Sequence, residues 1–171
     1  ALLNPKQNAV LLESALDCND SNIPDSRFSY IALSPHTVFK SKGGNTWING
    51  TYQTGNPFEL LQQMIKTEER NGDLPLFSPG GCVGYFGYDF KNVLEPKLET
   101  KANDDRSFWD AHLIFPRIII AFDHQESRIV ISSDEQNSTL VSTITDILDS
   151  RSNKLGKQLN GRQQNQASAE I

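Results

Sequence analysis

The sequence of 171 residues has little cysteine and no long apolar run. Its two cysteines, Cys18 and Cys82, are far apart and in no metal-ligand spacing, so we expect free thiols in a reducing compartment. No apolar run approaches the ~18 residues of a membrane span, and no signal peptide is visible. These absences predict a cytoplasmic protein with no membrane partner.

Positive charge is also scarce and scattered. The formal net charge is −5, and no cluster of lysine and arginine interrupts the acidic balance. A nucleic-acid surface needs a basic patch or stripe, so we expect no nucleic-acid partner. The three histidines are isolated in sequence and in no metal-ligand spacing, which favours turn or strand residues over catalysts: His36, His112 and His124.

Short apolar runs separated by turn residues predict strands. We expect strands over residues 8–14 and 26–35, the second closed by Pro35. Residues 18–25 have the composition of a loop. Two β-branched runs around residues 123–127 predict an antiparallel hairpin. Gly43-Gly44 and Asn49-Gly50 indicate tight turns, the latter of type I′.

The most distinct helix begins at Asn56. This residue is a predicted N-cap, followed by Pro57 at the first helical position and Glu59 three residues past the cap. The helix is expected to stop near Asn71-Gly72. Its predicted apolar stripe consists of Phe58, Leu61 and Ile65, with Leu60 and Met64 beside them.

A second amphipathic helix is expected over residues 138–150. Residues 151–171 contain hardly any large apolar side chain, which predicts a polar linker or disordered tail after a domain of residues 1–150. Antiparallel strands with few helices indicate an α+β fold, because the regular strand–helix alternation of a doubly wound fold is missing.

Four glycines crowd into "SPGGCVGYFGYD", residues 78–89. Their spacing fits neither a P-loop nor a dinucleotide fingerprint, and a carboxylate at Asp89 would repel phosphate. We therefore interpret the segment as a strand that another backbone approaches closely, bent at Gly80-Gly81. Tyr85 and Phe86 would face opposite sides, and Asp89 would bind local amides or cap the next segment.

Four motifs together resemble one family. "GGCVGYFGYD" is similar to the Gly-Gly-x-x-Gly-Tyr-x-x-Tyr-Asp signature shared by anthranilate synthase component I and aminodeoxychorismate synthase component I. It contributes a structural motif of Gly80, Gly81, Gly84, Tyr85, Tyr88 and Asp89. "LLES", "DSRFSYIALSP" and "AFDH" match further family strands in family order, so the resemblance covers roughly residues 9–133.

The resemblance implies an α+β fold in which antiparallel sheets pack orthogonally with helices outside. It also implies that the chemistry resides in a carboxy-terminal chorismate-binding half, which the sequence as given would lack. That half would supply the Mg²⁺-binding glutamates and the acid–base groups, and a glutamine amidotransferase subunit or domain would deliver ammonia. No catalytic residue, metal site or cofactor is therefore expected in this sequence.

What the resemblance assigns to this region is a tryptophan pocket. A buried zwitterion needs a donor for its carboxylate, an acceptor for its ammonium and apolar walls for its indole. The positions that match the family's pocket are Glu13, Ser14, Asp25, Ser26, Arg27 and Phe28. Without the resemblance, Ser14 is an ordinary strand-end hydroxyl and Arg27 a surface arginine.

Two enzymes remain open at this point. Lys91 and Asn92 replace the Val-Arg that anthranilate synthases commonly carry, although Glu95 is in place. This departure favours aminodeoxychorismate synthase, which serves p-aminobenzoate and folate biosynthesis. The intact "LLES" favours the alternative, an anthranilate synthase component I of tryptophan biosynthesis that tryptophan inhibits. Isochorismate or salicylate synthases are a distant third. A non-catalytic amino-acid-binding module is the alternative from another class.

Overall fold

The computed structural model describes residues 8–14, 27–68, 80–95, 97, 106–133 and 139–150. The chain forms two units, Ala1–Asp134 and Glu135–Ile171. The described part of the second unit is a helix of residues 139–150, which confirms the predicted amphipathic helix. The expected loop at residues 18–25 and the expected linker or tail at residues 151–171 both lie outside the described residues.

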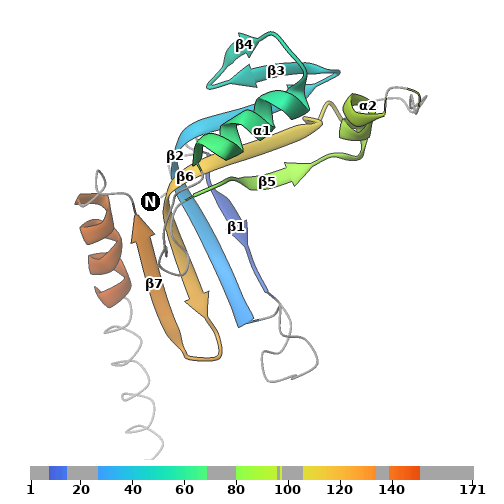
Figure 1. Ribbon diagram of the computed structural model, residues 1–171. Helices are drawn as coiled ribbons and strands as arrows, with labels where there is room; N and C mark the ends of the chain where they lie inside the picture. The colour runs from blue at the N-terminus through green and yellow to red at the C-terminus, as the bar shows by residue number, and fades with distance from the viewer. Residues whose placement is uncertain are drawn as a thin grey trace, which may run out of the picture. The chain divides into compact units, whose positions relative to one another are not determined.

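The described part of the first unit is built on an antiparallel sheet of seven strands (Figure 1). Neighbouring strands are hydrogen-bonded in the order β4-β3-β2-β6-β5, and in addition β1 pairs with β2 and β7 pairs with β6. The strands are β1 Val10–Leu12, β2 Phe28–Lys42, β3 Asn45–Ile48, β4 Thr51–Gln53, β5 Val83–Phe86, β6 Ala111–Asp123 and β7 Arg128–Ser133. The antiparallel α+β arrangement is the one that the sequence predicts.

The long strands β2 and β6 each belong to two groups of strands. Near one end they pair with β1 and β7, and near the other with β3 and β5. Figure 1 shows the sheet changing direction between these groups. At the change, Pro35 lies opposite Pro116 and the register shifts before Thr37. Neither proline has an N–H to donate, so the hydrogen-bond ladder is interrupted at the point where the sheet bends.

The predicted end of the second strand at Pro35 is wrong. β2 continues through this proline to Lys42, and Ser34 before it adopts a positive φ of 52°. A proline is tolerated at a bulge because the ladder is already interrupted there. The residue that was expected to stop the strand instead marks its bend.

Helix α1, Pro57–Glu68, confirms the predicted cap and part of the predicted stripe, of which Phe58 and Ile65 are exposed. The Asn56 side-chain oxygen accepts hydrogen bonds from the backbone N–H groups of Phe58 at 2.9 Å and Glu59 at 3.3 Å. Pro57 and Leu61 are buried, whereas Phe58 is 42% exposed. Because Pro57 itself packs inward, the buried face is rotated away from Phe58 and Ile65, towards Leu60 and Met64.

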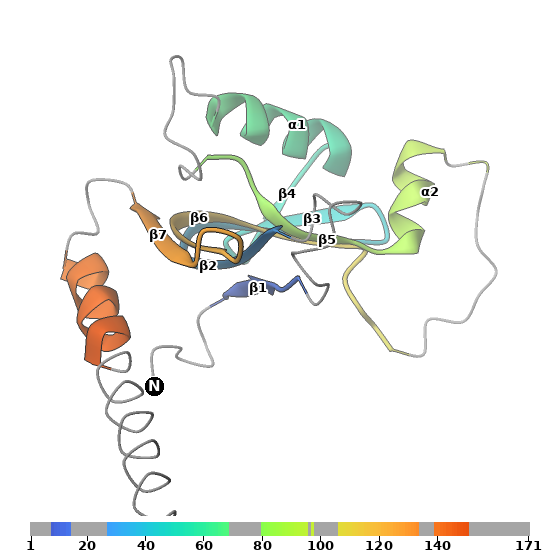
Figure 2. The same cartoon turned by 90° about the horizontal axis from the view of Figure 1, so that it is seen from below.

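A hydrophobic core cluster lies between α1 and the half of the sheet that carries β3 and β5; Figure 2 shows α1 over one face of these strands. A 3-10 helix η2, Tyr88–Phe90, and the short helix α2, Lys91–Leu94, contribute to the same layer. The buried members are Phe39, Leu61, Phe90, Ala111, Leu113 and Phe115.

The predicted turns are confirmed. Gly43 and Gly44 have φ of 55° and 77°, and Asn49 and Gly50 have φ of 51° and 82°. Two consecutive positive values are those of a type I′ hairpin turn, which suits the right-handed twist of the flanking strands. The hairpin of β6 and β7 closes around residues 124–127, as expected.

Candidate binding site at the bend of the sheet

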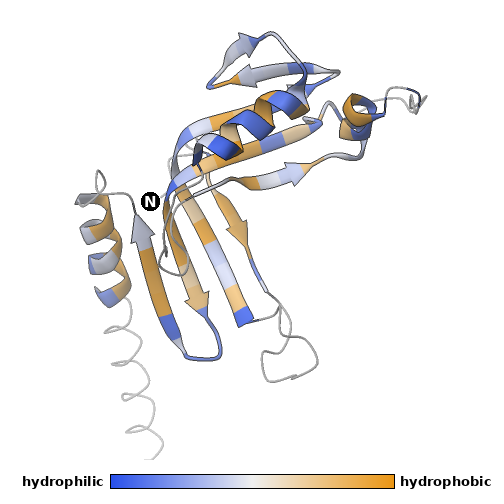
Figure 3. Cartoon of the chain, viewed as in Figure 1, coloured by the Kyte–Doolittle hydropathy of each residue, from blue (hydrophilic) through white to orange (hydrophobic). Residues whose placement is uncertain are grey.

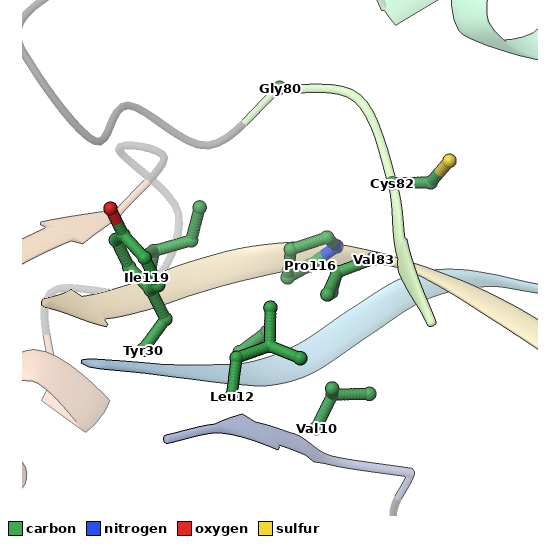
Figure 4. A pocket seen from close by; sticks show the side chains of 9 residues that line it. Val10, Leu12, Tyr30, Gly80, Cys82, Val83, Pro116 and Ile119 are labelled. Carbon is green, nitrogen blue, oxygen red and sulfur yellow. The ribbon is translucent and has the colours of Figure 1, made fainter. Parts of the chain in front are cut away.

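An apolar pocket of about 260 Å³ lies where β1, β2 and β6 meet the segment that leads into β5 (Figure 4). Its lining consists of Val10, Leu12, Tyr30, Ala32, Gly80, Cys82, Val83, Pro116 and Ile119. Figure 3 shows the apolar residues that run along β1 and β6 in this region. The pocket is slightly smaller than the ~300–1,000 Å³ of typical small-molecule sites, so it suits the apolar part of a small ligand.

Tyr30 connects this pocket to a polar cluster at the start of β2. Its ring centroid lies 6.1 Å from that of Phe28, and the guanidinium carbon of Arg27 lies 4.8 Å from the Phe28 centroid. Alternate residues of a strand share a face, so Phe28 and Tyr30 extend the same surface. Burial, and then the charge of Asp123, raise the pKa of Tyr30.

Arg27 and Asp123 form a two-pronged ion pair. Arg27 Nε donates to Oδ1 of Asp123 at 2.8 Å and Nη2 donates to Oδ2 at 2.7 Å. Asp123 is 2% exposed and also accepts from Arg128 Nε and the Glu126 backbone N–H, both at 3.2 Å. The hydrogen bond from Arg27 holds the pKa of Asp123 far below its ordinary value. The charge of Arg27 is therefore largely matched within the protein.

A second chain of contacts joins three of the sequence motifs. The Ser14 backbone N–H donates to Ser29 Oγ at 3.0 Å, and that oxygen lies 2.7 Å from His124 Nε2. The His124 backbone N–H donates to the Arg27 carbonyl at 2.9 Å. "LLES", "SRFS" and "AFDH" thus meet at one corner. Sequence reasoning assigned no site role to Ser29 or Asp123 and expected His124 only as a turn or strand residue; their positions inside the matched motifs were the available signal.

The described residues of the predicted tryptophan site lie at this corner and do not line the apolar pocket itself. Glu13 and Ser14 directly follow β1, Arg27 precedes β2 and Phe28 begins it. None of these four lines the pocket, which instead uses their neighbours Leu12 and Tyr30. Asp25 and Ser26 lie outside the described residues. The structure therefore brings four of the six positions to the end of the strands that line the pocket.

Gly84 has the role that the sequence predicts. It pairs with Leu113, and a Cβ added to it would lie 2.1 Å from the His112 carbonyl oxygen, so only glycine fits this approach of two backbones. Gly81 has the positive φ, 73°, of a bend, whereas its neighbour Gly80 borders the pocket.

The two aromatic residues after Gly84 diverge as expected. The Tyr85 ring contacts His112 at 6.1 Å between centroids, and the Phe86 ring contacts Phe90 at 5.0 Å. Phe90 belongs to the core beneath the helices, so Tyr85 occupies the opposite face of the sheet.

The capping role expected of Asp89 is wrong. The N-caps of η2 and α2 are Gly87 and Phe90, and neither has a side-chain capping hydrogen bond. Asp89 lies within η2, with a carboxylate oxygen 4.0 Å from Lys91 Nζ, and that ammonium also lies 4.7 Å from the centroid of the exposed Tyr88 ring. The motif's last residues thus form a local surface cluster.

Within the described part of the chain, no three histidine, cysteine or acidic side chains gather as ligands for a metal ion. Cys82 is a free thiol, and burial raises its pKa. Burial and the charge of Lys40 lower the pKa of His112. No helix among the described residues is long and apolar enough to cross a membrane.

A family model for chorismate binding enzymes matches residues 8–170. The chain belongs to this family. It is 35% identical over 100 residues to anthranilate synthase component 1 of Leptospira biflexa, covering 58% of this chain and 20% of the relative. For the Acetivibrio thermocellus protein of the same name, identity is 34% over 113 residues, covering 62% and 22%.

A third relative matches more of the chain. Anthranilate synthase component 1 of Bacillus caldotenax is 27% identical over 137 residues, which is 75% of this chain and 26% of that protein. This member of the chorismate binding family therefore spans about a quarter of the length of the curated relatives it matches. The fold is that of the crystal structure of anthranilate synthase component I from Streptococcus pneumoniae TIGR4, with a TM-score of 0.59, 24% identity, and coverage of 72% of this chain and 29% of that one.

Proposed function

We propose that this chain is the amino-terminal region of a chorismate-aminating enzyme, and specifically of an anthranilate synthase component I. The observation that carries the proposal is that the relatives matching this region bear that name. They favour the alternative reading of the sequence over aminodeoxychorismate synthase, which Lys91 and Asn92 suggested.

The surroundings of Lys91 and Asn92 reduce their weight as evidence for a particular reaction. Lys91 Nζ donates to the Asn92 side-chain oxygen at 2.9 Å and packs against Tyr88, which is 80% exposed. Neither residue borders the apolar pocket. A substitution at this surface changes local contacts without changing the site, so it distinguishes the two enzymes poorly.

The role that we propose for the region is to form part of a tryptophan-type pocket. The apolar cavity beside Leu12 and Tyr30 would take the indole, and the corner that holds Ser14 and Arg27 would take the polar end. Because Arg27 is already paired with Asp123, we assign the hydrogen bonds to the ligand mainly to Ser14 and its neighbours. The remaining predicted members are Glu13, Asp25, Ser26 and Phe28.

The chemistry of amination is assigned elsewhere in the proposed enzyme. The described residues do not fit a Mg²⁺ site, which needs several oxygen ligands in near-octahedral order. We propose that a chorismate-binding region supplies Mg²⁺ ligands and acid–base groups, and that a glutamine amidotransferase partner delivers ammonia. This chain would contribute the pocket and the sheet that supports it.

The product of the complete enzyme tests this assignment. With chorismate, Mg²⁺ and ammonia, we expect anthranilate, identified by mass and fluorescence. The 171-residue chain alone, as the matched control, should give no turnover above a buffer blank. Accumulation of aminodeoxychorismate would restore the alternative that the sequence favoured, and turnover by the chain alone would contradict the division of roles.

A further inference from the structure

Two segments that border the candidate pocket are tied together by His124. Its backbone N–H donates to the Arg27 carbonyl at 2.9 Å, and its ring Nε2 lies 2.7 Å from Ser29 Oγ. Ser29 Oγ in turn accepts the Ser14 backbone N–H at 3.0 Å. Ser14 and Arg27 are the described residues on either side of residues 15–26. His124 therefore contacts the backbone at Arg27 directly and the backbone at Ser14 through Ser29.

The position of Ser29 makes these hydrogen bonds effective. The residue is 5% exposed, so water competes weakly for its hydroxyl. The ladder between β1 and β2 ends at the pair Leu12 and Tyr30, and among the described residues the bond to Ser29 fixes the backbone at Ser14 beyond the ladder. Since Ser29 Oγ accepts the Ser14 N–H, its own proton can be donated to His124 Nε2.

We propose that His124 and Ser29 are positioning residues of the candidate pocket. They fix the backbone at Ser14 and Arg27 and thereby hold the Ser14 hydroxyl where a ligand can reach it. Within the described residues, the hydrogen bond of Ser14 is made by its backbone, which leaves the hydroxyl available. With Ser29 as the donor, His124 Nε2 accepts, which places the ring N–H on Nδ1. The proposal rests on the proposed function, because it takes the ligand to be an amino acid.

The test compares two variants with two matched controls. Ser29→Ala and His124→Phe remove the two proposed positioning side chains, which together we call the relay. Ser41→Ala removes another buried serine of β2, whose hydroxyl has no partner among the described residues. His36→Phe removes a histidine that instead contacts Thr37 and Glu68. Melting temperatures of all four variants show whether each remains folded.

We expect amide hydrogen exchange at Ser14 to rise about tenfold in Ser29→Ala and His124→Phe and to stay unchanged in both controls. In the unsubstituted chain, ¹⁵N shifts should show the Nδ1–H form of His124, and Ser29→Ala should abolish this preference. Tryptophan titrated into a longer protein that includes a chorismate-binding region should bind about three- to tenfold more weakly when that protein carries either relay substitution, as expected for one lost hydrogen bond.

The outcomes separate the two claims. Unchanged exchange at Ser14 in both relay variants would overturn the positioning role. Faster exchange with unchanged tryptophan affinity would also overturn it, because the fixed backbone would then not serve the ligand. If tryptophan does not bind even the unsubstituted longer protein, the proposed pocket fails, and the exchange data alone decide whether the relay holds Ser14.

Discussion

At the scale of single residues, Gly84 shows how directly one backbone position can depend on its neighbour. A Cβ there would lie 2.1 Å from the His112 carbonyl oxygen and 2.9 Å from the Leu113 Cα, both of which belong to backbone that cannot rotate away. We predict that Gly84→Ala lowers the free energy of unfolding by about 2 kcal/mol, as overpacking does in well-packed interiors. Urea unfolding measures the change.

Gly80 provides the matched control. Its added Cβ would meet nothing nearer than a backbone oxygen at 4.0 Å, so Gly80→Ala should change the free energy of unfolding by less than about 0.5 kcal/mol. Equal effects of the two substitutions would show that the glycine segment does not rely on the close approach at Gly84.

Asp123 gives a prediction about pH. Hydrogen bonds from Arg27 hold its pKa below the ordinary value, so the ionised carboxylate stabilises the fold above pH ~3.9, the pKa of an unfolded aspartate. That contribution is lost as the pH falls below this value. We predict that Asp123→Asn lowers the melting temperature at pH 7, and that the difference from the unsubstituted chain shrinks towards pH 3.

The exposed Asp89 is the control for this effect. Asp89→Asn removes a carboxylate that is 46% exposed and 4.0 Å from its lysine, so it should change the melting temperature little at either pH. A difference for Asp123→Asn that stays constant from pH 7 to pH 3 would contradict the role of the ionised carboxylate.

At the scale of elements, α1 carries a prediction about which members of its expected apolar stripe are buried. Leu61 is 3% exposed and belongs to the core, whereas Phe58 is 42% exposed. Leu61→Ala should cost about 2–5 kcal/mol of unfolding free energy and Phe58→Ala about 1 kcal/mol or less. Chemical denaturation of both variants measures the two costs, and the reverse order would contradict the burial of Leu61 and the exposure of Phe58.

The elements themselves were predictable because local chemistry determines them. Asn56 and Pro57 specify the start of α1 through hydrogen bonds within a few residues. Asn49-Gly50 specifies the turn between β3 and β4 through its own dihedral angles. Pro35 was misread because its effect depends on Pro116, which is far away in sequence and opposite in the sheet. The face of α1 that is buried likewise depends on the residues of the sheet against which the helix packs.

At the scale of the whole molecule, the motifs indicated the family, and the contacts between motifs required the structure. Ser14, Arg27 and Phe28 lie near the strands that line the pocket, but no spacing rule predicts that Asp123 pairs with Arg27 from the far end of β6. The apolar pocket was not predicted either, because its lining comes from four separated segments. Long-range register, rather than local propensity, assembles the site.

The pocket's size also explains why we expect its other wall to lie elsewhere in the proposed enzyme. Small-molecule sites bury most of their ligand. The cavity has a volume of about 260 Å³, and its lining is apolar apart from Tyr30 and Cys82, so it covers only part of an indole amino acid. Each 1.4 kcal/mol of lost burial weakens binding about tenfold. The isolated chain should therefore bind tryptophan at millimolar concentrations or not measurably.

Calorimetric titration of tryptophan tests the central claim most directly, using the 171-residue chain, a longer protein that includes a chorismate-binding region, and Ser14→Phe in that longer protein. The account predicts binding at least about a hundredfold tighter to the longer protein than to the chain, and loss of that binding in Ser14→Phe. Micromolar binding by the chain alone, abolished by Ser14→Phe, would instead make it a self-sufficient amino-acid-binding module. Absence of binding by every protein would contradict the pocket.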